Sequence, residues 1–348
     1  MRFGHFLYHI NPDPAREAQA IDEALAEARR AESLGYDSVW LAEHHFSGEV
    51  AYGDPAVFAA AIALQTSRIR IGFAVLEMAL HHPVRVAIQT ALLDHLSKGR
   101  LLVGVARGST YDGFQYRGFG TSVQFGRDSL EEAEELLLKA WTEDNVEHQG
   151  RHWDVAFGTI RPRPYTKPHP PLLRACVTDE SVAAMARIGR PIMIRTSTAA
   201  RAGEQIALYA DTMRAAGFDP AAVEAALDQL WVWRDVYVSD TDDHALAEFQ
   251  PGFEDYERDM ERLRARWSPP DQPMTTRPAH RLRDAAGAID LATTEIFVGS
   301  PERIRDRVAE LRDAGVRNLL MTHRGGVVPP EYGSRSMRLL SERVMPYV

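Results

Sequence analysis

The sequence predicts an α/β fold, a (β/α)8 TIM barrel with insertions after strands 4 and 7. Short apolar runs alternate with amphipathic segments at helical spacing along the chain, as parallel strands and their crossover helices do. The chain has 348 residues, which suits a barrel with insertions. A doubly wound open sheet is the alternative, but no Gly-x-Gly-x-x-Gly pattern follows the first apolar run.

The strands are predicted from apolar runs, several of which end in polar residues. We expect them at residues 2–8, from 38, at 69–76, at 101–106, from 172, at 192–195, at 230–238 and at 317–322. No repeat of fixed period and no low-complexity segment interrupts this order. We therefore expect residues 1–348 to form one domain.

The helices are predicted from apolar spacing and from their caps. In the first, Ile21, Leu25 and Ala28 recur on one face, and Gly35 suits the position after the helix. Asp54-Pro55 and Ser300-Pro301 place a capping side chain before a proline at the first helical position. Further helices are expected after His82-Pro83, near 180–188, at 199–216 and after Pro330.

Two long segments do not fit the simple alternation. Residues 107–170 contain one predicted helix, about 127–141, and a turn at Gly150-Arg151. They also contain a proline-rich stretch, which cannot form a regular helix or strand. Residues 242–290 are polar and helix-prone, with Ser268 to Pro273 as the loosest part. These are the expected insertions.

Composition narrows the classes of partner. The formal net charge is −9, which argues against nucleic acid or an anionic membrane surface as a partner. No apolar run approaches the roughly 18 residues that span a bilayer, and no leader peptide is recognisable. The single cysteine, Cys176, excludes an internal disulfide and fits the cytoplasm.

Glu43, His44 and His45 follow the second predicted strand directly. Active sites of such barrels are assembled at the C-terminal ends of the strands, so this run is a candidate for acid–base chemistry. A hydrogen-bond cluster and a metal site are the alternatives. Adjacent residues of a strand point to opposite faces, which disfavours metal ligation by the two histidines together. His81-His82-Pro83 fits the entry of a helix better than a ligand set.

Arg107 follows the fourth predicted strand and precedes a glycine. A guanidinium in this place suits a phosphate or a carboxylate. Arg127, Thr178 and Ser181 lie near predicted helix starts, where free backbone N–H groups favour the same anion. Structural arginines and ordinary helix caps are the alternative interpretation.

Several motifs in one order resemble the bacterial luciferase-like flavin-dependent monooxygenases. They are Phe3-Gly-His-Phe-Leu7, Gly35-Tyr-Asp-Ser-Val-Trp-Leu-Ala-Glu-His-His-Phe46, His82-Pro-Val-Arg85, Leu93-Asp-His-Leu-Ser-Lys-Gly-Arg100, Gly104-Val-Ala-Arg-Gly108, Gly299-Ser-Pro-Glu302 and Val344-Met-Pro-Tyr347. Each motif alone is weak, but the combination is specific and extends over essentially the whole chain.

The resemblance implies a barrel that binds reduced FMN, supplied by a separate flavin reductase, at the strand C-terminal ends. It implies that O2 adds to the flavin as a C4a-hydroperoxide and that one oxygen atom passes to a small organic substrate. Aromatic and apolar residues are plentiful near the predicted mouth of the barrel, which favours an apolar or aromatic substrate. His44 matches the catalytic histidine and Glu43 its neighbour in the catalytic set. Phe6 matches a residue beside the flavin ring.

The resemblance also assigns the cofactor surroundings. Ala74-Val75 matches the position of a non-prolyl cis peptide bond under the flavin, and Ala106 stands where luciferase α-subunits have a reactive cysteine. Arg107, Arg127, Thr178 and Ser181 match the phosphate-binding set, although Val177 occupies a usually acidic position. The insertion after strand 7 resembles a mobile lid.

Three other functions stay open at this point. A deazaflavin (F420)-dependent oxidoreductase would use the same barrel without consuming O2. A non-catalytic flavin-binding subunit would need a catalytic partner, and a metal-dependent hydrolase would use Glu43 and the histidine pairs. Family analogy further implies a homodimer formed by helices of the N-terminal half. The helix Val57 to Leu64 is rich in small residues, which suits either that interface or packing against the barrel.

Overall fold

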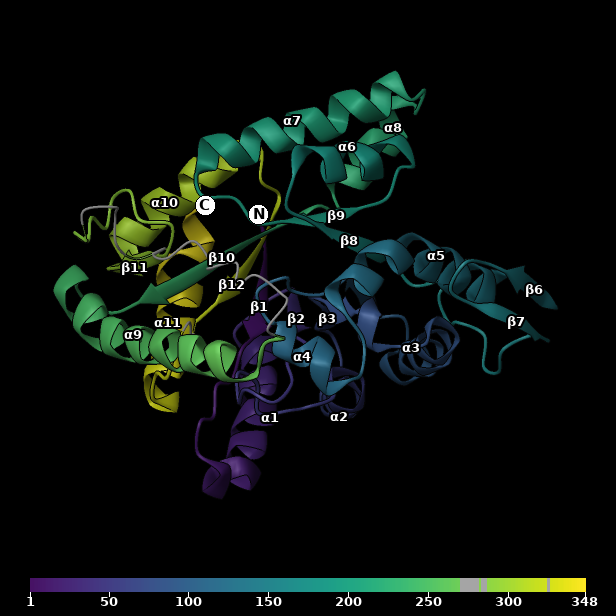
Figure 1. The fold of residues 1–348 in the computed structure, drawn as a ribbon. Helices are drawn as coiled ribbons and strands as arrows, with labels where there is room; N and C mark the ends of the chain where they lie inside the picture. Colours follow the sequence, from purple (N-terminus) through teal and green to yellow (C-terminus); the bar gives the residue numbers. More distant parts are fainter. Residues whose placement is uncertain (270–281, 283–286, 324–325) are drawn as a thin grey trace.

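The computed structural model describes residues 1–269, 282, 287–323 and 326–348. Its centre is a closed barrel of eight parallel strands (Figure 1). Around the barrel their order is β1 (Arg2–Leu7), β2 (Ser38–Leu41), β3 (Arg70–Phe73), β5 (Leu101–Ala106), β8 (Leu172–Cys176), β9 (Ile192–Ile194), β10 (Trp231–Val238) and β12 (Asn318–Thr322). Val232 opposite Ile194 joins β10 to β9 and closes the ring. The predicted (β/α)8 barrel is confirmed, and the open sheet is excluded.

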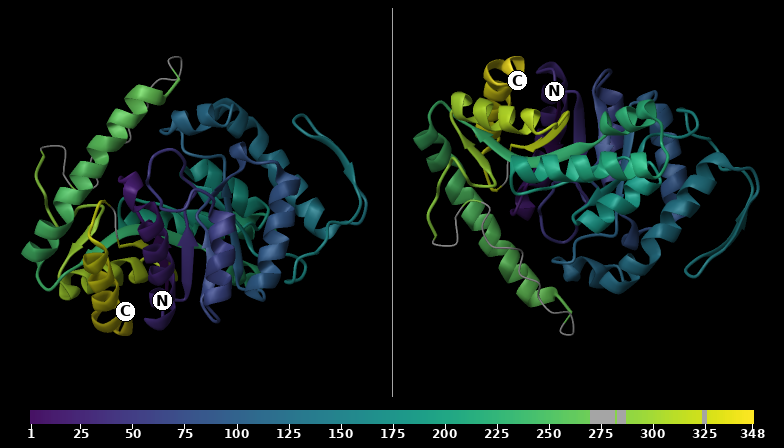
Figure 2. Two further views of the ribbon diagram at one scale, coloured as in Figure 1. Left: turned by 90° about the horizontal axis from the view of Figure 1, so that it is seen from below. Right: turned by 90° about the horizontal axis from the view of Figure 1, so that it is seen from above.

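Helices follow the strands and surround the barrel (Figure 2). They are α1 (Glu17–Ser33), α2 (Pro55–Gln65), α3 (Pro83–Ser97), α5 (Val123–Thr142), α6 (Asp179–Arg187), α7 (Ala199–Ala215), α10 (Pro301–Asp313) and α11 (Pro330–Arg343). The predicted caps are present: the Asp54 carboxylate accepts from the backbone N–H groups of Ala56 and Val57, and Ser300 accepts from that of Arg303. The short helix α8 (Pro220–Leu227) was not predicted.

The third predicted strand, residues 69–76, is wrong as a single element. β3 ends at Phe73, the Ala74–Val75 peptide bond is cis, and a separate two-residue strand β4 (Leu76–Glu77) follows. β3 pairs with β2, whereas β4 pairs with β5. The chain changes its pairing partner between Phe73 and Leu76, so the apolar run does not continue as one strand.

The insertion after β5 carries α4 (Gly113–Gly118) and a hairpin of β6 (Val146–Gln149) and β7 (Asp154–Phe157) beyond α5. The hairpin extends away from the barrel on the right of Figure 1. The predicted turn at Gly150-Arg151 lies between its two strands. The predicted helix of residues 127–141 is α5, which begins four residues earlier, at Val123, because Ser122 caps it.

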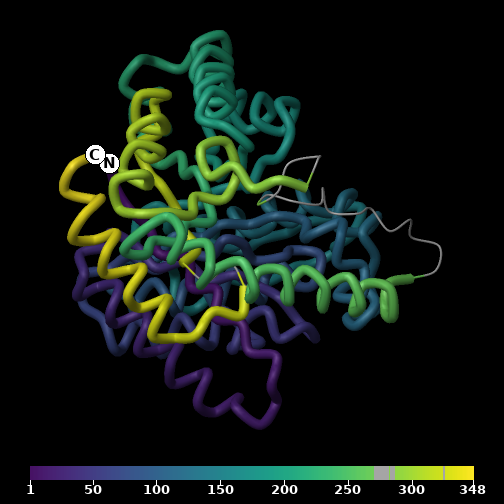
Figure 3. The backbone as a smooth tube through the Cα atoms, turned by 90° about the vertical axis from the view of Figure 1, so that its left-hand side faces the viewer, coloured from purple at the N-terminus to yellow at the C-terminus, as the bar shows by residue number. Residues whose placement is uncertain are grey.

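The insertion after β10 carries the long helix α9 (Asp242–Trp267) and then β11 (Phe297–Gly299), which pairs with β10. Figure 3 shows α9 running past the barrel beside α1 and α11. Most of the stretch predicted to be loosest, Ser268 to Pro273, lies outside the described residues. None of the helices that are described is long and apolar enough to cross a bilayer.

The barrel interior packs aromatic rings against glycines. Trp40 is fully buried, and its ring lies 5.1 Å from that of Trp231. A Cβ atom at Gly72 would lie 2.3 Å from the Trp40 ring, and one at Gly104 would lie 2.1 Å from the carbonyl oxygen of Phe73. These glycines let neighbouring strands and rings approach closely, and the packing fixes the strand ends that carry the candidate site.

Candidate active site

The site residues predicted from the sequence lie on or just after the C-terminal ends of the barrel strands. Phe6 is in β1, Glu43 and His44 follow β2, Ala74 and Val75 follow β3, Ala106 ends β5, Arg107 follows it, and Thr178 precedes α6 after β8. Arg127 is the fifth residue of α5, and Ser181 lies in the first turn of α6. The strands meet at this edge of the barrel, so the topology gathers the candidates there.

Glu43 is the centre of a buried hydrogen-bond cluster. Its Oε1 atom accepts hydrogen bonds from His45 Nε2 at 3.1 Å and His81 Nε2 at 2.7 Å, and its Oε2 atom accepts from the Glu77 backbone N–H at 2.7 Å. Burial raises the pKa of the Glu43 carboxyl, but these hydrogen bonds outweigh it and bring the pKa to about 2. The carboxylate is therefore charged, and it accepts three hydrogen bonds. His81, which the sequence assigned only to a helix entry, belongs to this cluster.

Glu77 is a second buried carboxyl, with the opposite protonation state. Burial raises its pKa well above the ordinary value, and the charges of Glu43 and Asp112 raise it further. Its Oε1 atom accepts a bond of 3.3 Å from the Ser109 backbone N–H, and its Oε2 atom is buried without a partner among the described residues. A protonated carboxyl therefore lies beside a charged one at this edge.

His44 points away from the Glu43 cluster and keeps 15% of its side chain exposed. Its Nδ1 atom lies 3.4 Å from Gln115 Nε2 and 3.6 Å from Glu49 Oε2. The ring meets that of Tyr8 edge-on, with 5.6 Å between centroids. His44 and His45 thus have different partners, as expected for adjacent residues, although both lie in a loop beyond β2. In the part of the chain that the structure describes, no group of three or more His, Cys, Asp or Glu side chains is arranged to hold a metal ion.

Small and aromatic residues lie beside these polar groups. The Ala74–Val75 bond is cis, as the resemblance implied. Ala106 lies opposite Glu77 in the pairing of β4 and β5. Phe6 is buried against Trp233, with their rings edge-on at 5.8 Å.

Arg107 and Arg127 are cations without a carboxylate partner among the described residues. The Arg107 side chain is partly exposed and the Arg127 side chain is exposed, and neither makes a hydrogen bond or ion pair to a described residue. A Cβ atom at Gly126 would lie 3.0 Å from the Arg107 carbonyl oxygen, so the start of α5 packs directly on the end of β5. The two arginines therefore belong to one region of the barrel edge.

Thr178 and Ser181 form a capping box at the start of α6. The Thr178 hydroxyl accepts from the Ser181 backbone N–H at 3.2 Å, and the Ser181 hydroxyl donates to the Thr178 carbonyl at 2.7 Å. β8 and β5 are neighbours, so this helix start lies near the end of the strand that precedes Arg107. Both hydroxyls still have acceptor capacity for an external donor, but their present bonds are those of an ordinary cap.

Helix α9 is tied to this edge of the barrel at two points. The Tyr256 hydroxyl donates to Glu49 Oε1, and Arg264 Nε donates to Asp112 Oδ1 at 2.8 Å. Asp112 is 1% exposed, so the second contact is a buried ion pair. Helix α9 also contacts α4.

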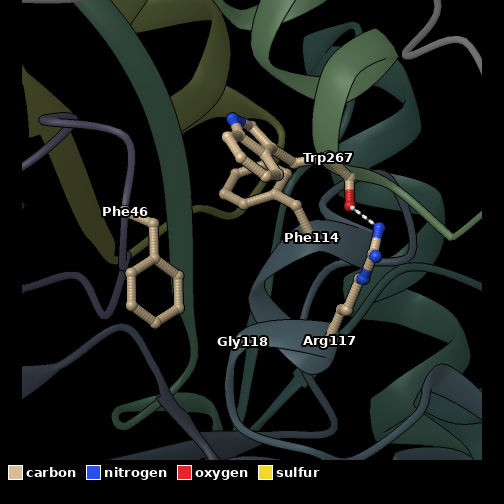
Figure 4. Close-up of a pocket in the computed structure, with 5 residues that line it drawn as sticks. All are labelled: Phe46, Phe114, Arg117, Gly118 and Trp267. Carbon is tan, nitrogen blue, oxygen red and sulfur yellow. Dashed lines mark hydrogen bonds between the residues drawn. The ribbon is translucent and has the colours of Figure 1, made fainter.

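A hollow of about 500 Å³ lies between the end of α9 and α4. Figure 4 shows its lining, with the Phe114 and Trp267 rings close together, Phe46 across from them, and Arg117 bonded to the Trp267 carbonyl at 3.4 Å. Phe46 has a φ of 64°, a left-handed conformation that a bulky residue rarely adopts. Its ring lies over Gly118, where a Cβ atom would lie 2.3 Å from it.

Comparison with known proteins decides the family. The sequence profile described as luciferase-like monooxygenase matches residues 1–318, most of the chain. This chain belongs to the luciferase-like monooxygenase family. The family membership confirms the resemblance drawn from the motifs, and the barrel is the fold of its structural relatives.

Relatives within and around the family differ in how much of the chain they match. An uncharacterised protein of Sinorhizobium fredii is 29% identical over 94% of this chain and 92% of its own length. The alkanal monooxygenase alpha chain of the Kryptophanaron alfredi symbiont is 30% identical over 56% of this chain and 54% of its own length. This chain thus aligns with about half of the alkanal monooxygenase.

Solved structures of luciferase-like barrels superpose on the whole chain. The monooxygenase RslO1 from Streptomyces bottropensis has a TM-score of 0.83 at 27% identity, and covers 99% of each chain. The oxygenating constituent of 3,6-diketocamphane monooxygenase from Pseudomonas putida, a type II Baeyer–Villiger enzyme solved with FMN, has a TM-score of 0.78 at 20% identity and covers 100% of this chain and 99% of its own. An F420-dependent secondary alcohol dehydrogenase has a TM-score of 0.70 at 18% identity and covers 99% and 98%. At these lower identities the likeness shows the fold alone.

Sequence reasoning missed four side chains that the structure places around His44 and Glu43: Tyr8, Glu49, His81 and Gln115. Tyr8 directly follows β1, so the same topological argument would have found it, whereas Glu49 lies eight residues beyond the end of β2. Gln115 lies in the insertion after β5, where the spacing of apolar residues predicts no element. Only the structure shows that it lies in α4 and faces His44.

Proposed function

We propose that this chain is the oxygenase of a two-component flavin-dependent monooxygenase. It takes reduced FMN from a separate reductase and uses O2 to oxygenate a small apolar or aromatic substrate. The observation that carries the proposal concerns Arg107 and Arg127, at the active-site edge of a luciferase-like barrel. Neither side chain has a hydrogen-bond or ion-pair partner among the described residues. Two guanidinium groups without a carboxylate among the described residues suit a bound phosphate monoester.

The other residues at this edge fit the ring of a flavin. Phe6 is apolar, and Ala74, Val75 and Ala106 are small. Phe6 lies on β1, Ala74 and Val75 lie between β3 and β4, and Ala106 ends β5. When bound, reduced FMN supplies the two electrons that activate O2. The phosphate would be held by Arg107 and Arg127, with Thr178 and Ser181 of the α6 start as further candidates.

Proton transfer, positioning and the exclusion of water are assigned to other residues at this edge. His44 is the proposed proton donor and acceptor, because it is the imidazole at this edge that keeps an exposed face and is not occupied by Glu43. Glu43 fixes His45 and His81 and so shapes the wall beside the flavin. Helix α9 is tied to this edge by Tyr256 and Arg264, and would limit the access of water to a bound flavin.

The substrate preference follows from the hollow. Phe46, Phe114 and Trp267 form its walls, and such a lining favours an apolar or aromatic ring. The hollow adjoins the reaction edge, because Phe46 is two residues from His44 and Phe114 is next to Gln115.

Rapid mixing tests the proposal. The purified protein, loaded with photoreduced FMN, is mixed with oxygenated buffer, and the flavin absorbance is followed. We expect reoxidation slower than that of free reduced FMN and dependent on protein concentration. Reoxidation at the rate of free flavin, together with tight binding of reduced F420 in a parallel titration, would replace this function by that of an F420-dependent oxidoreductase.

We also propose that the chain acts in the cytoplasm as a homodimer. Cys176 is a free thiol, in keeping with a reducing compartment. Val57 and Leu64 on α2 are 67% and 72% exposed, and Leu92 on the neighbouring α3 is 48% exposed. A second copy of the chain would cover these apolar side chains.

A further inference from the structure

The Nδ1 atom of His44 lies between two side chains of opposite hydrogen-bonding character. Gln115 Nε2 is 3.4 Å from it and Glu49 Oε2 is 3.6 Å from it. An amide NH2 group can only donate to this atom, and a carboxylate can only accept from it. The two neighbours therefore favour different positions of the imidazole proton.

The orientation of Gln115 is fixed by its other end. Its Oε1 atom accepts a hydrogen bond of 2.7 Å from the His45 backbone N–H, and the residue is fully buried. The amide cannot flip without placing its NH2 group against that N–H. Gln115 therefore presents a donor to His44 and favours the tautomer with the proton on Nε2.

The orientation of Glu49 is fixed in the same way. Its Oε1 atom accepts from the Tyr8 hydroxyl at 2.5 Å and from the Tyr256 hydroxyl of α9, and its Oε2 atom accepts from Ser47 at 3.1 Å. A separation of 2.5 Å is typical of a hydroxyl bound to a carboxylate. Glu49 is 1% exposed. At 3.6 Å its Oε2 atom lies just beyond hydrogen-bond length from Nδ1, so the buried carboxylate acts on His44 by electrostatic attraction, which favours the tautomer with the proton on Nδ1.

We propose that Glu49 and Gln115 are positioning residues that select the tautomer of His44, with Glu49 holding the form that is competent for proton transfer. With its proton on Nδ1, the ring has a free lone pair on Nε2. That atom takes up one proton from the reacting molecules and later returns it, and the transient imidazolium keeps its Nδ1–H directed at Glu49. This chemical role rests on the proposed monooxygenase function, but the tautomer selection does not.

Glu49→Gln tests the selection with almost no change in shape. The glutamine oxygen takes the place of Oε1, because two tyrosine hydroxyls donate there. Its NH2 group then occupies the Oε2 position, where Ser47 can turn its hydroxyl to accept. Both neighbours of Nδ1 become donors, and the imidazole proton must move to Nε2.

Side-chain ¹⁵N NMR of ¹⁵N-histidine-labelled protein, without flavin or substrate, reads the tautomer directly. The His44 signals are assigned by their loss in His44→Asn. We expect a protonated Nδ1 in the wild type and an unprotonated Nδ1 in Glu49→Gln. An unprotonated Nδ1 in the wild type, or a protonated one in Glu49→Gln, would overturn the proposal.

The exchange variant Glu49→Gln/Gln115→Glu is the matched control, because it has the same composition and charge as the wild type. It restores one donor and one acceptor at Nδ1, so the proton should return to Nδ1. Glu49→Gln alone decides the matter if the exchange variant does not fold. A folded exchange variant that keeps the proton on Nε2 contradicts the proposal.

Turnover then separates this proposal from the proposed function. In Glu49→Gln we expect product formed per reduced FMN to fall about 10²-fold or more, the scale of general acid–base catalysis, while the Kd for FMN stays within about threefold of the wild type. A moved proton with unchanged turnover would overturn the catalytic part. If the wild type transfers no oxygen at all, the monooxygenase assignment fails, and the NMR result still decides the tautomer selection.

Discussion

Two neighbouring glutamates show how strongly a few hydrogen bonds decide the state of a buried carboxyl. Glu43 and Glu77 are both less than 5% exposed and are linked by the bond from the Glu77 backbone N–H to Glu43. Glu43 receives three N–H donors and is charged, whereas Glu77 receives one and is neutral. Burial acts on both in the same direction, so the difference comes from the donors and from the neighbouring charges, which are carboxylates around Glu77 and a histidine beside Glu43.

Glu43→Gln should lower the free energy of unfolding at pH 7 by about 2–4 kcal/mol, the scale for breaking a buried charged network. The amide has one acceptor atom for three N–H donors, so its NH2 group must face at least one of them. Urea denaturation measures the change.

The pH dependence of that loss has a definite sign. The pKa of Glu43 is lowered from its ordinary value of 4.5 to about 2 in the folded protein, so its stabilisation is present above pH 4.5 and is lost as the pH falls toward 2. The difference between wild type and Glu43→Gln should therefore shrink between pH 5 and pH 3. A difference that is constant over this range would mean that the charge of Glu43 does not stabilise the fold.

Glu77→Gln should behave in the opposite way. The folded protein keeps Glu77 protonated, and this becomes unfavourable as the pH rises above the ordinary value of 4.5 toward the raised pKa. Glutamine has the same shape and no charge, so the variant should gain stability relative to wild type by about 1 kcal/mol or more between pH 5 and pH 8. Chemical denaturation at both pH values measures this, and a relative loss at pH 8 would show that Glu77 is charged.

Arg107→Ala should weaken FMN binding by about 1.5–3 kcal/mol, the contribution of a hydrogen bond to a charged group. Titration of the protein with FMN, followed by fluorescence, gives the Kd. Arg214→Ala is the control, because Arg214 lies in the last turn of α7, where it pairs with Asp211 at the opposite end of the barrel. Equal Kd values for both variants and the wild type would place the phosphate elsewhere.

At the scale of elements, the end of β5 depends on contact with β3. Gly104 lies where a Cβ atom would be 2.1 Å from the Phe73 carbonyl oxygen, directly before the Ala74–Val75 bond. The Phe73 carbonyl oxygen is a backbone atom, so it cannot move aside as the end of a flexible side chain can. The contact therefore holds the chain under the proposed flavin position.

Gly104→Ala should lower the free energy of unfolding by about 2–4 kcal/mol through this overlap. Gly53→Ala is the matched control, because a Cβ atom at Gly53 meets nothing within 4 Å, and its effect should stay within about 0.5 kcal/mol. Thermal and urea unfolding of both variants test the pair. Equal stability of the two would mean that β3 and β5 separate easily.

The elements also show which sequence signals were sufficient. Strands and capped helices followed from apolar runs and from residues such as Asp54 and Ser300, because those signals are local. The split of residues 69–76 into β3 and β4 did not follow from the run itself, since a cis bond between Ala74 and Val75 leaves no mark on apolar periodicity. Of the hairpin of β6 and β7, the sequence predicted only the turn, because the two strands are short and partly polar.

At the scale of the whole molecule, the proposed homodimer can be tested by a substitution on α2. Leu64→Glu places a charge on the exposed apolar face of α2 and should convert the protein to monomers in sedimentation velocity, with stability within about 0.5 kcal/mol of the wild type. Ile188→Glu is the control, because Ile188 is 58% exposed after α6, away from that face. A wild type that sediments as a monomer would reject the dimer.

The sequence predicted only those residues of the candidate site that lie close to the end of a strand along the chain. Glu43, His44 and Arg107 follow strand ends, and barrel topology brings such residues together. The bond between Tyr256 and Glu49 joins residues 207 positions apart, and the ion pair of Arg264 with Asp112 joins residues 152 apart. No pattern in either segment indicates its partner, so the contacts of α9 become visible only in the folded chain.

Helix α4 is a single short element with two faces of different use. Gln115 is directed at His44 and His45, while Phe114, Arg117 and Gly118 line the aromatic hollow. One helix of six residues cannot bend to satisfy both sides independently. A molecule that fills the hollow and shifts α4 therefore also moves the amide that faces the histidine. The proposed substrate hollow and the proposed site of proton transfer therefore share one short helix.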